Sequence, residues 1–298
     1  MIRAGIIGLG DMGSGLAKNL IGNGFQTTGF DLDQGRLDAF SALGGSIAAD
    51  ANEVGRNADV VFVMVMTGGQ AKSVLFGDAN NGMVSHMAAG STVILTATIK
   101  PNEAREIGAM IADTGVNLID SPVSGGFPGA QGGTLTMMAA APSSVMEACA
   151  PVMQAVSTTI HHVGEEAGMG QTVKACLQTL IGSIFSATFE ASVLAAKAGV
   201  SGEVLYNVFS TSGAACGVMN TALGNIIDRK FENTGSHIAT MHKDLTISLA
   251  LAEELGVPMN MAASAMQLFH AGKSKYPDGD NWVVTRVIED IVGAQLHR

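Results

Sequence analysis

Short apolar runs alternate with stretches of helical spacing through the first half of this 298-residue chain, and no other feature constrains the fold as strongly. The runs predicted to be strands are Ala4–Ile7, Gln26–Phe30, Val60–Val65, Thr92–Leu95 and Asn117–Ile119. The predicted helices between them include Met12–Asn23, Gln34–Ala42 and Pro101–Thr114. Nearly continuous apolar strands that alternate with helices indicate a parallel sheet covered on both faces. Two later strands, Thr134–Ala140 and Thr159–Val163, bracket a helix over Ser143–Val156 and extend this sheet.

The pattern changes after Gly164, where strand-like alternation stops. Gly168–Lys197 has Ala, Leu, Ile and Val at helical spacing and no Pro, so we expect one long helix there. Further helices are expected at Gly202–Ser210, Gly217–Ile227, Ile238–Leu255 and Asn260–Ala271. The chain is therefore predicted to have an α/β domain over residues 1–164 and an all-α domain over residues 165–298, joined by the long helix.

Charge and composition exclude several classes of partner. The formal net charge of −10 argues against nucleic acid, since binding to phosphates needs a cationic surface. No continuous apolar run approaches the roughly 20 residues of a membrane span, so no membrane association is expected. The three cysteines, Cys149, Cys176 and Cys216, are far apart and odd in number, which is typical of small buried side chains in a reducing compartment. The first residues lead directly into a strand without a signal peptide, and a cytoplasmic location is expected.

A glycine motif at the N-terminus predicts a dinucleotide site. Gly8, Gly10 and Gly13 form G-x-G-x-x-G between the first strand and the first helix, with Leu9, Asp11 and Met12 at the intervening positions. The first glycine permits a tight turn, the second lets a pyrophosphate approach the backbone, and the third permits close packing of helix and strand. The free N–H groups of the helix N-terminus would bind the phosphates. The sheet is therefore predicted to be a Rossmann-type, doubly wound sheet. The alternative is a plain glycine-rich turn.

Asp31 ends the second predicted strand, about 20 residues after the motif, where a carboxylate binds ribose hydroxyls. A carboxylate at this position repels the 2′-phosphate of NADP, so we expect NAD to be preferred over NADP. Asp31 could instead simply cap the following helix.

A second motif, Asp120-Ser121-Pro122-Val123-Ser124-Gly125-Gly126, directly follows a predicted strand. Successive glycines leave backbone N–H groups available, and the hydroxyl of Ser124 adds a donor. The stretch could form an anion site that suits a carboxylate, although an ordinary Pro/Gly turn would have the same composition.

A third motif begins the long helix and places Lys174 in an almost uncharged stretch. Gln178 lies four residues later and therefore on the same helix face. Burial would lower the pKa of this lysine and make it a usable proton carrier. An exposed helix lysine between apolar neighbours is the alternative.

A fourth motif, Met241-His242-Lys243-Asp244-Leu245, lies in an otherwise apolar helix. Lys243 could supply a second cation to an anionic ligand, or it could form a Lys–Asp pair on the surface. The histidines show no H-E-x-x-H motif and no cluster with carboxylates, so we expect no metal.

These four motifs together resemble the β-hydroxyacid dehydrogenase family, the group of 3-hydroxyisobutyrate dehydrogenase and tartronate semialdehyde reductase. The resemblance covers nearly the whole chain. It implies an NAD-dependent oxidoreductase that transfers hydride from the 3-hydroxyl of a small carboxylic acid, with a lysine as general acid and base. A semialdehyde reductase, of the tartronate or succinic semialdehyde type, is the alternative within the family.

The resemblance also implies roles for individual residues. Lys174 matches the catalytic lysine, and Ser124, Gly125 and Gly126 match the site for the substrate carboxylate. Gln178 matches an amide one turn after the lysine. Thr98 matches a hydroxyl near the nicotinamide, Val65 and Met66 match cofactor contacts, and Lys243 matches a lysine close to both cofactor and substrate.

The chain departs from the family pattern at two places. Met64-Val65-Met66 replaces the usual Met-Leu-Pro, and Leu177-Gln178 replaces the usual Asn-Asn. The second departure and the run Gln70–Gly77 are more similar to the L-threonate dehydrogenase branch. A methyltransferase, a non-catalytic NAD-binding module and a decarboxylating sugar-acid phosphate dehydrogenase remain as alternatives. The apolar helices of the second domain, such as Ile184–Ala198, indicate a homodimer or homotetramer.

Overall fold

The computed structural model describes residues 2–78 and 81–298, and it divides into two compact units, Met1–Lys174 and Ala175–Arg298. The predicted domain boundary at residue 164 lies ten residues earlier than this division, which falls inside a helix. Helix α8 (Met169–Lys197) continues from one unit into the other. The boundary between compact units therefore need not coincide with the boundary between the strand-rich and the helical parts of the chain. The boundary at 164 stays a prediction.

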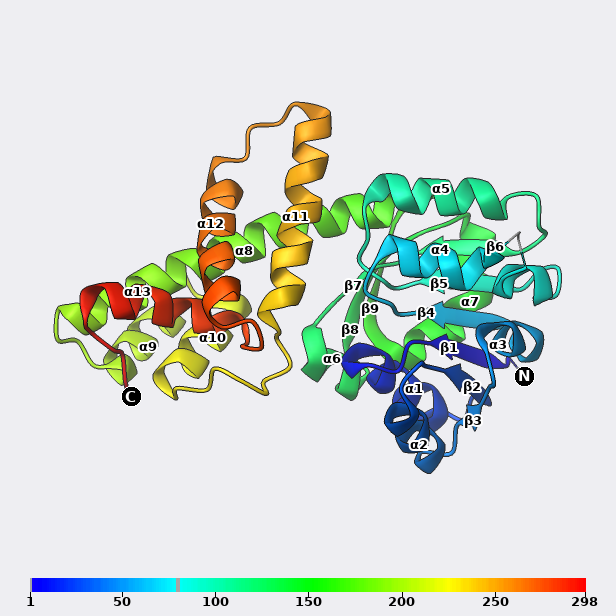
Figure 1. Cartoon of the computed structure of the whole chain (residues 1–298), viewed down its shortest axis with the longest axis horizontal. Coiled ribbons are helices and arrows are strands. Elements are labelled where there is room, and N and C mark those ends of the chain that lie inside the picture. The colour runs from blue at the N-terminus through cyan, green and yellow to red at the C-terminus, as the bar shows by residue number, and fades with distance from the viewer. Residues whose placement is uncertain (1, 79–80) are drawn as a thin grey trace. The chain divides into compact units, whose positions relative to one another are not determined.

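The first unit contains a nine-stranded sheet with the strand order β3-β2-β1-β4-β5-β6-β8-β7, in which β9 pairs with β8 (Figure 1). Its strands are β1 (Ala4–Ile7), β2 (Thr27–Phe30), β3 (Ser46–Ile47), β4 (Val60–Val63), β5 (Thr92–Leu95), β6 (Asn117–Asp120), β7 (Val123–Ser124), β8 (Leu135–Ala140) and β9 (Ser157–Gly164). The pairings from β3 to β6 are parallel, which confirms the predicted doubly wound sheet. The pairing of β6 with β8 is antiparallel, a direction that the sequence pattern did not predict.

Helices cover both faces of this sheet. They are α1 (Asp11–Gly22), α2 (Gln34–Ala42), α3 (Ala51–Asn57), α4 (Gly68–Phe76), α5 (Pro101–Ile111), α6 (Gly126–Gly132), α7 (Ser143–Val156) and the 3-10 helix η2 (Met83–His86). Strand residues alternate between two cores: Ile6 and Phe62 pack on one face, and Ile7 and Val61 pack on the other. This alternation explains why the strands are apolar at nearly every position.

The second unit is helical, as predicted. Besides its part of α8, it contains α9 (Gly202–Thr211), α10 (Gly217–Ile227), α11 (Ile238–Leu255), α12 (Asn260–Lys275), η3 (Asn281–Val283) and α13 (Val284–Val292). Its core is built around Phe185, Phe189, Phe269 and Trp282, and the rings of Phe185 and Trp282 meet edge to face at 5.3 Å. A two-pronged ion pair between Arg229 and Glu289, at 2.5 and 2.8 Å, joins the end of α10 to α13.

Helix α8 is, by length and composition, apolar enough to cross a membrane, with a mean hydropathy of 1.4 over its most apolar window. The prediction from the sequence considered only uninterrupted apolar runs, and polar residues interrupt the apolar ones in α8. The helix is partly buried within the protein, and its Phe185 and Phe189 belong to the core of the second unit. These features are those of a core helix.

Candidate active site

The glycine motif lies at the carboxyl end of β1, where the strand order reverses direction between β2 and β4. Ligands of open α/β sheets bind at such a switch point. Gly8 has φ +87°, and a Cβ there would lie 2.2 Å from the carbonyl oxygen of Met64. A Cβ on Gly13 would lie 1.8 Å from the carbonyl oxygen of Gly8. A Cβ on Gly10 would meet only the Arg36 side chain, at 3.8 Å, so the backbone is open to a ligand there.

The N-terminus of α1 has no side-chain cap. Its N–H groups therefore suit an anion such as a pyrophosphate, which would take the place of a cap. Of the residues between the glycines, Leu9 is buried, Met12 is half-buried against the core and Asp11 is exposed.

Asp31 lies at the carboxyl end of β2, and its side chain is only 8% exposed. Its carboxylate accepts hydrogen bonds from the N–H of Leu9 at 2.7 Å and of Asp33 at 2.9 Å. Arg36, half-exposed, approaches both carboxylate oxygens at 3.4 Å. Asp31 therefore holds the glycine loop in shape besides offering a negative charge beside it. The helix that follows is capped by Asp33 and not by Asp31, which removes the simple capping role as an explanation.

The loop after β4 carries two of the predicted cofactor contacts. Val65 is half-buried and packs on the core, whereas Met66 is exposed. The N–H groups of Met66 and Thr67 donate to Oε1 of Gln70, at 2.9 and 3.1 Å. The N–H of Gln70 donates to Oγ1 of Thr67 at 3.1 Å, and this reciprocal pair of Thr67 and Gln70 is a capping box that starts α4. The sequence analysis predicted strand up to Val65, but the strand ends at Val63, so both residues lie in the loop at the carboxyl edge.

Thr98 lies in the loop after β5, half-buried between the buried residues Ala97 and Ile99. Both neighbours are bound by Gln171, whose side chain is 1% exposed. Oε1 of Gln171 accepts from the N–H of Ile99 at 3.0 Å, and Nε2 donates to the carbonyl of Ala97 at 3.0 Å. Gln171 had no role predicted from the sequence, because a glutamine in a helical stretch is usually exposed.

Asp120 is the last residue of β6, Ser124 is the last residue of β7, and Gly125 and Gly126 follow directly after β7. Asp120 is fully buried, while Ser124 is half-buried and Gly125 and Gly126 are exposed. Gly125 and Gly126 have φ values of +128° and +58°, which favour glycine. The predicted carboxylate site therefore forms one turn whose backbone is accessible, and the buried Asp120 precedes this turn in the chain.

Lys174 lies on α8 and is 6% exposed, so the predicted burial is confirmed. Gln178 follows one turn later on the same continuous helix and is also 6% exposed. The two side chains therefore share a helix face. Cys176, between them, is exposed, because position 176 falls on another face of the helix. The expectation that all three cysteines are buried is confirmed for Cys149, wrong for Cys176 and met only in part for Cys216, which is half-buried.

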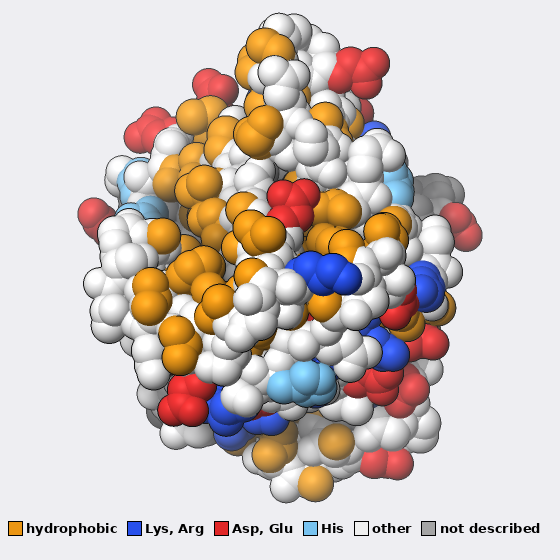
Figure 2. All heavy atoms as spheres, turned by 90° about the vertical axis from the view of Figure 1, so that its left-hand side faces the viewer, with side chains coloured by type: hydrophobic (Ala, Val, Ile, Leu, Met, Phe, Trp, Pro, Cys, Tyr) orange, Lys and Arg blue, Asp and Glu red, His pale blue; other side chains and the backbone are white. Residues whose placement is uncertain are grey.

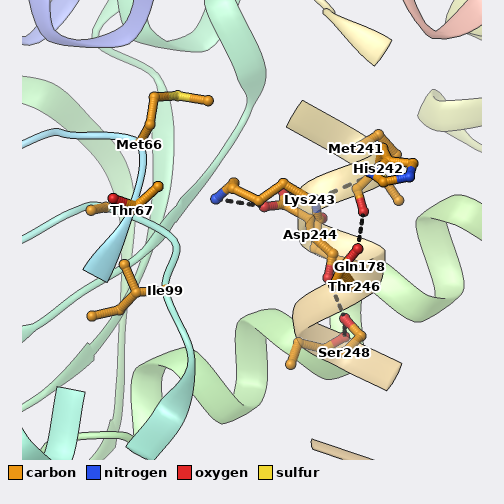
Figure 3. A network of polar contacts seen from close by, with 12 residues as sticks. Met66, Thr67, Ile99, Gln178, Met241, His242, Lys243, Asp244, Thr246 and Ser248 are labelled. Carbon is orange, nitrogen blue, oxygen red and sulfur yellow. Dashed lines mark hydrogen bonds and ion pairs between the residues drawn. The ribbon is translucent and has the colours of Figure 1, made fainter. Parts of the chain in front are cut away.

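A polar cluster in the second unit surrounds Gln178 (Figure 3). Its Nε2 donates to Oδ2 of Asp244 at 2.6 Å, and Oδ1 of Asp244 lies 3.0 Å from Nζ of Lys243. Asp244 is 4% exposed, so the pair is not on the surface, and the charge of Lys243 is partly balanced. Ser248 donates to the backbone carbonyls of Asp244 and Ala175, both at 2.9 Å. The sequence did not lead us to predict Asp244 as a member of this cluster. Its position directly after Lys243 in an apolar helix was the signal that could have identified it.

Oε1 of Gln178 is buried and accepts no hydrogen bond. Because Nε2 donates to the carboxylate of Asp244 at 2.6 Å and to Sδ of Met241 at 3.7 Å, the orientation of the amide is fixed, and its oxygen is the group that is available to a ligand. Among residues 2–78 and 81–298, no three His, Cys, Asp or Glu side chains are grouped as metal ligands would be.

The chain matches two family models that together span most of its length. The model of the NAD binding domain of 6-phosphogluconate dehydrogenase matches residues 3–164. The model described as NAD-binding of NADP-dependent 3-hydroxyisobutyrate dehydrogenase matches residues 168–288.

Curated proteins and solved structures show the same similarity. L-threonate dehydrogenase of Escherichia coli is 31% identical over 97% of this chain and 95% of its own length. NAD-dependent L-serine dehydrogenase of Pseudomonas aeruginosa is 31% identical over 98% of this chain and 100% of its own. The crystal structure of 3-hydroxyisobutyrate dehydrogenase from Salmonella typhimurium superimposes with a TM-score of 0.88, at 29% identity, over 96% of this chain and 100% of that one.

Proposed function

Because this chain belongs to the β-hydroxyacid dehydrogenase family, and so is an oxidoreductase acting on CH–OH groups, we propose that it oxidises the 3-hydroxyl of a small 3-hydroxy carboxylic acid similar to L-threonate or 3-hydroxyisobutyrate. The observation that carries the proposal is the buried Lys174, which shares a helix face with the acceptor Gln178.

The residues of the first unit fit a dinucleotide. The open backbone at Gly10 and the uncapped start of α1 suit the pyrophosphate. Asp31 suits the ribose hydroxyls, and its charge favours NAD over NADP. Leu9, Asp11, Met12, Val65, Met66 and Thr98 would form the remaining cofactor contacts. Bound NAD supplies the hydride acceptor for the oxidation.

The substrate carboxylate would bind to the hydroxyl of Ser124 and the backbone of Gly125 and Gly126. Lys174 would accept the proton of the 3-hydroxyl as the alcohol is oxidised, and would return it in the reverse direction. Proton transfer by a positioned group contributes about 10²- to 10⁴-fold to a rate. Lys243, which matches the family's lysine near cofactor and substrate, pairs with Asp244, and Asp244 also accepts from Gln178.

Gln178 favours a substrate that carries a hydroxyl donor. Among the described residues its Oε1 has no donor, so it can accept from a hydroxyl besides the one that is oxidised, and this supports the more highly hydroxylated L-threonate-like acid within the proposed class. The names of the Escherichia coli and Pseudomonas aeruginosa relatives, L-threonate and L-serine dehydrogenase, agree with a hydroxylated acid.

We propose further that the protein is a cytoplasmic homodimer or homotetramer. Exposed apolar side chains support association: Leu180 and Leu194 on α8, Val204 and Val208 on α9, and Ile291 on α13 are each more than half exposed. Figure 2 shows hydrophobic side chains gathered on one face of the molecule.

The test of the proposed function is NADH formation with 3-hydroxyisobutyrate, L-threonate, glycerate, serine and 4-hydroxybutyrate. We expect turnover with at least one 3-hydroxy acid and none with 4-hydroxybutyrate, whose alcohol lies one carbon further from the carboxylate. The kcat of Lys174→Ala should fall by about 10²- to 10⁴-fold, while NADH binding should still quench the fluorescence of the variant. Near-full turnover by Lys174→Ala would rule out the lysine, and the absence of turnover with every acid would contradict the proposed substrate class.

A further inference from the structure

Gln171 uses every strong hydrogen-bonding position of its side-chain amide except one lone pair. Besides its bonds to Ile99 and Ala97, Nε2 donates to Oδ1 of Asp120 at 2.8 Å. The partners fix which end of the amide is which, since a carboxylate and a carbonyl need a donor and the N–H of Ile99 needs an acceptor. Gln171 thus forms hydrogen bonds to the backbone on both sides of Thr98, and the nitrogen that binds Ala97 also binds Asp120.

Asp120 in turn holds the first turn of α8. Its Oδ2 accepts from the N–H of Gly168 at 2.8 Å and of Gln171 at 3.2 Å. A carboxylate in this place satisfies N–H groups that a helix leaves without partners at its start. Burial raises the pKa of Asp120, and the hydrogen bonds from Gln171 and Gly168 oppose that rise. Buried polar groups that are fully bonded in this way are rigid.

The backbone around Asp120 and Gln171 is closely packed. A Cβ on Gly170 would lie 2.5 Å from the carbonyl oxygen of Met138 and 2.6 Å from that of Asp120. A Cβ on Gly168 would lie 2.8 Å from the carbonyl oxygen of Pro101. The start of α8 therefore rests directly on the backbone of β6, β8 and the first residue of α5, and a change of its register requires those segments to move.

We infer that Asp120 and Gln171 are positioning residues, which lock the Thr98 loop and the first turn of α8 to each other so that Lys174, in the second turn of the helix, is held in the geometry for proton transfer. The inference rests on the proposed function, because it takes Lys174 as the proton carrier and Thr98 as a residue beside the cofactor. A displacement of about 1 Å in such an arrangement can cost about 10²-fold in rate.

The kinetic test compares Gln171→Leu and Gln171→Glu with the wild-type protein, using the best acid of the substrate panel. We expect kcat to fall by about 10- to 100-fold, whereas KM for NAD changes by less than about threefold. The primary deuterium isotope effect on kcat should increase, because a misplaced lysine slows the chemical step. A purely structural role would lower the folded fraction without changing the isotope effect, and that result would overturn the inference.

Asn117→Leu is the matched control. Nδ2 of Asn117 donates to the backbone carbonyls of Gly90 and Ser91, at 3.2 and 3.5 Å, and so joins β6 to the turn before β5 at the opposite edge of the sheet. Its loss should lower Tm and leave kcat per folded molecule unchanged. An equal loss of kcat in Asn117→Leu would show that the effect is one of general stability.

A rescue experiment tests the pairing itself. Gln171→Glu places two carboxylates side by side, and adding Asp120→Asn restores a donor and an acceptor between them. Because Oδ1 of the new Asn can still accept from Gly168, we expect the double variant to recover at least about threefold in kcat over Gln171→Glu alone. A double variant no faster than Gln171→Glu would overturn the pairing.

Hydrogen exchange separates this inference from the proposed function. In the protein without ligands, Gln171→Leu should accelerate exchange of the Ile99 amide hydrogen, whose acceptor is removed, and leave that of Val93 in β5 unchanged. Unchanged exchange at Ile99 would overturn the positioning role whatever the enzyme's substrate. Failure of the wild-type protein to reduce NAD with any acid would contradict the proposed function and leave the exchange result standing.

Discussion

At the scale of single residues, we expect Asp31 to set the preference between the two nicotinamide coenzymes. Its carboxylate lies 3.4 Å from the guanidinium of Arg36. In Asp31→Asn the acceptor for the Leu9 amide is kept, but the charge that repels a 2′-phosphate and engages Arg36 is lost. We expect the ratio of kcat/KM for NADP to that for NAD to rise at least about 10-fold, since bonds to charged groups contribute about 1.5–3 kcal/mol.

Arg36→Ala provides the control for this prediction. Added to Asp31→Asn, it should remove most of the gain with NADP, because the cation available to the 2′-phosphate is gone. A coenzyme ratio that stays constant in Asp31→Asn would show that Asp31 does not discriminate between the coenzymes.

Gly13 and Gly22, on the same helix, form a second pair of test positions. A Cβ on Gly13 would meet the carbonyl oxygen of Gly8, whereas a Cβ on Gly22 would meet nothing within 4 Å. Gly13→Ala should weaken NADH binding at least about 10-fold, because the glycine loop must move. Gly22→Ala should bind NADH normally and unfold at an equal or slightly higher Tm. Fluorescence titration measures both, and similar affinities for the two variants would argue against a loop that contacts the cofactor.

At the scale of helices and strands, the sequence predicted elements well where burial dictates their composition. The bounds of α2, α7, α10 and α11 agree with the prediction. Helices α7, α10 and α11 each bury apolar residues at helical spacing, whereas α2 is mostly polar and begins directly after its capping residue, Asp33. The two-residue strands β3 and β7 and the seven-residue helices α3 and α6 were not predicted, because segments of this length carry too little periodicity. The nine-residue helices α4 and α13 were not predicted either, although α2 has the same length.

The site was predictable only in part, for a related reason. Gly8, Gly13 and Asp31 belong to a local motif whose spacing follows from one strand–turn–helix unit. Gln171 and Asp120 are 51 residues apart, and they meet because α8 follows β9, which pairs with β8, and β8 pairs with β6 at Asp120. Neither helix or strand propensity nor residue spacing predicts such a contact. Asp120 was therefore predicted only as part of a turn, and no role was predicted for Gln171.

The pairing of α11 with α12 contains a pH-dependent contact. Nε2 of His242 lies 2.8 Å from Nδ1 of His270, and burial, followed by Lys273 and His270, lowers the pKa of His242 from 6.5. The folded protein therefore binds fewer protons than the unfolded chain in this range, so stability is fully present above pH 6.5 and falls as the pH decreases through 6.5 towards the folded pKa.

We expect Tm of the wild-type protein to decrease between about pH 7.5 and pH 5.5 more steeply than Tm of His242→Gln. His161→Gln, which removes an exposed histidine on β9, is the control and should keep the wild-type slope. Parallel curves for the wild-type protein and His242→Gln would contradict the assigned protonation.

At the scale of the whole molecule, the exposed apolar side chains of α8, α9 and α13 predict self-association. Leu194 is 72% exposed and Leu32, in the loop after β2, is 94% exposed. Light scattering at micromolar concentration should give a dimer or tetramer for the wild-type protein and for Leu32→Glu. Leu194→Glu should shift the population towards the monomer, because a carboxylate in an apolar interface is costly. A wild-type monomer of 30.4 kDa would contradict this prediction.

The most direct test of the central claim follows the hydrogen that is transferred. The best acid of the substrate panel, deuterated at the carbon that carries the hydroxyl, is incubated with the protein and NAD, and the recovered NADH is examined by mass spectrometry. The account predicts one deuterium per NADH formed. Recovered NADH without deuterium, or a panel from which no NADH forms, would contradict it.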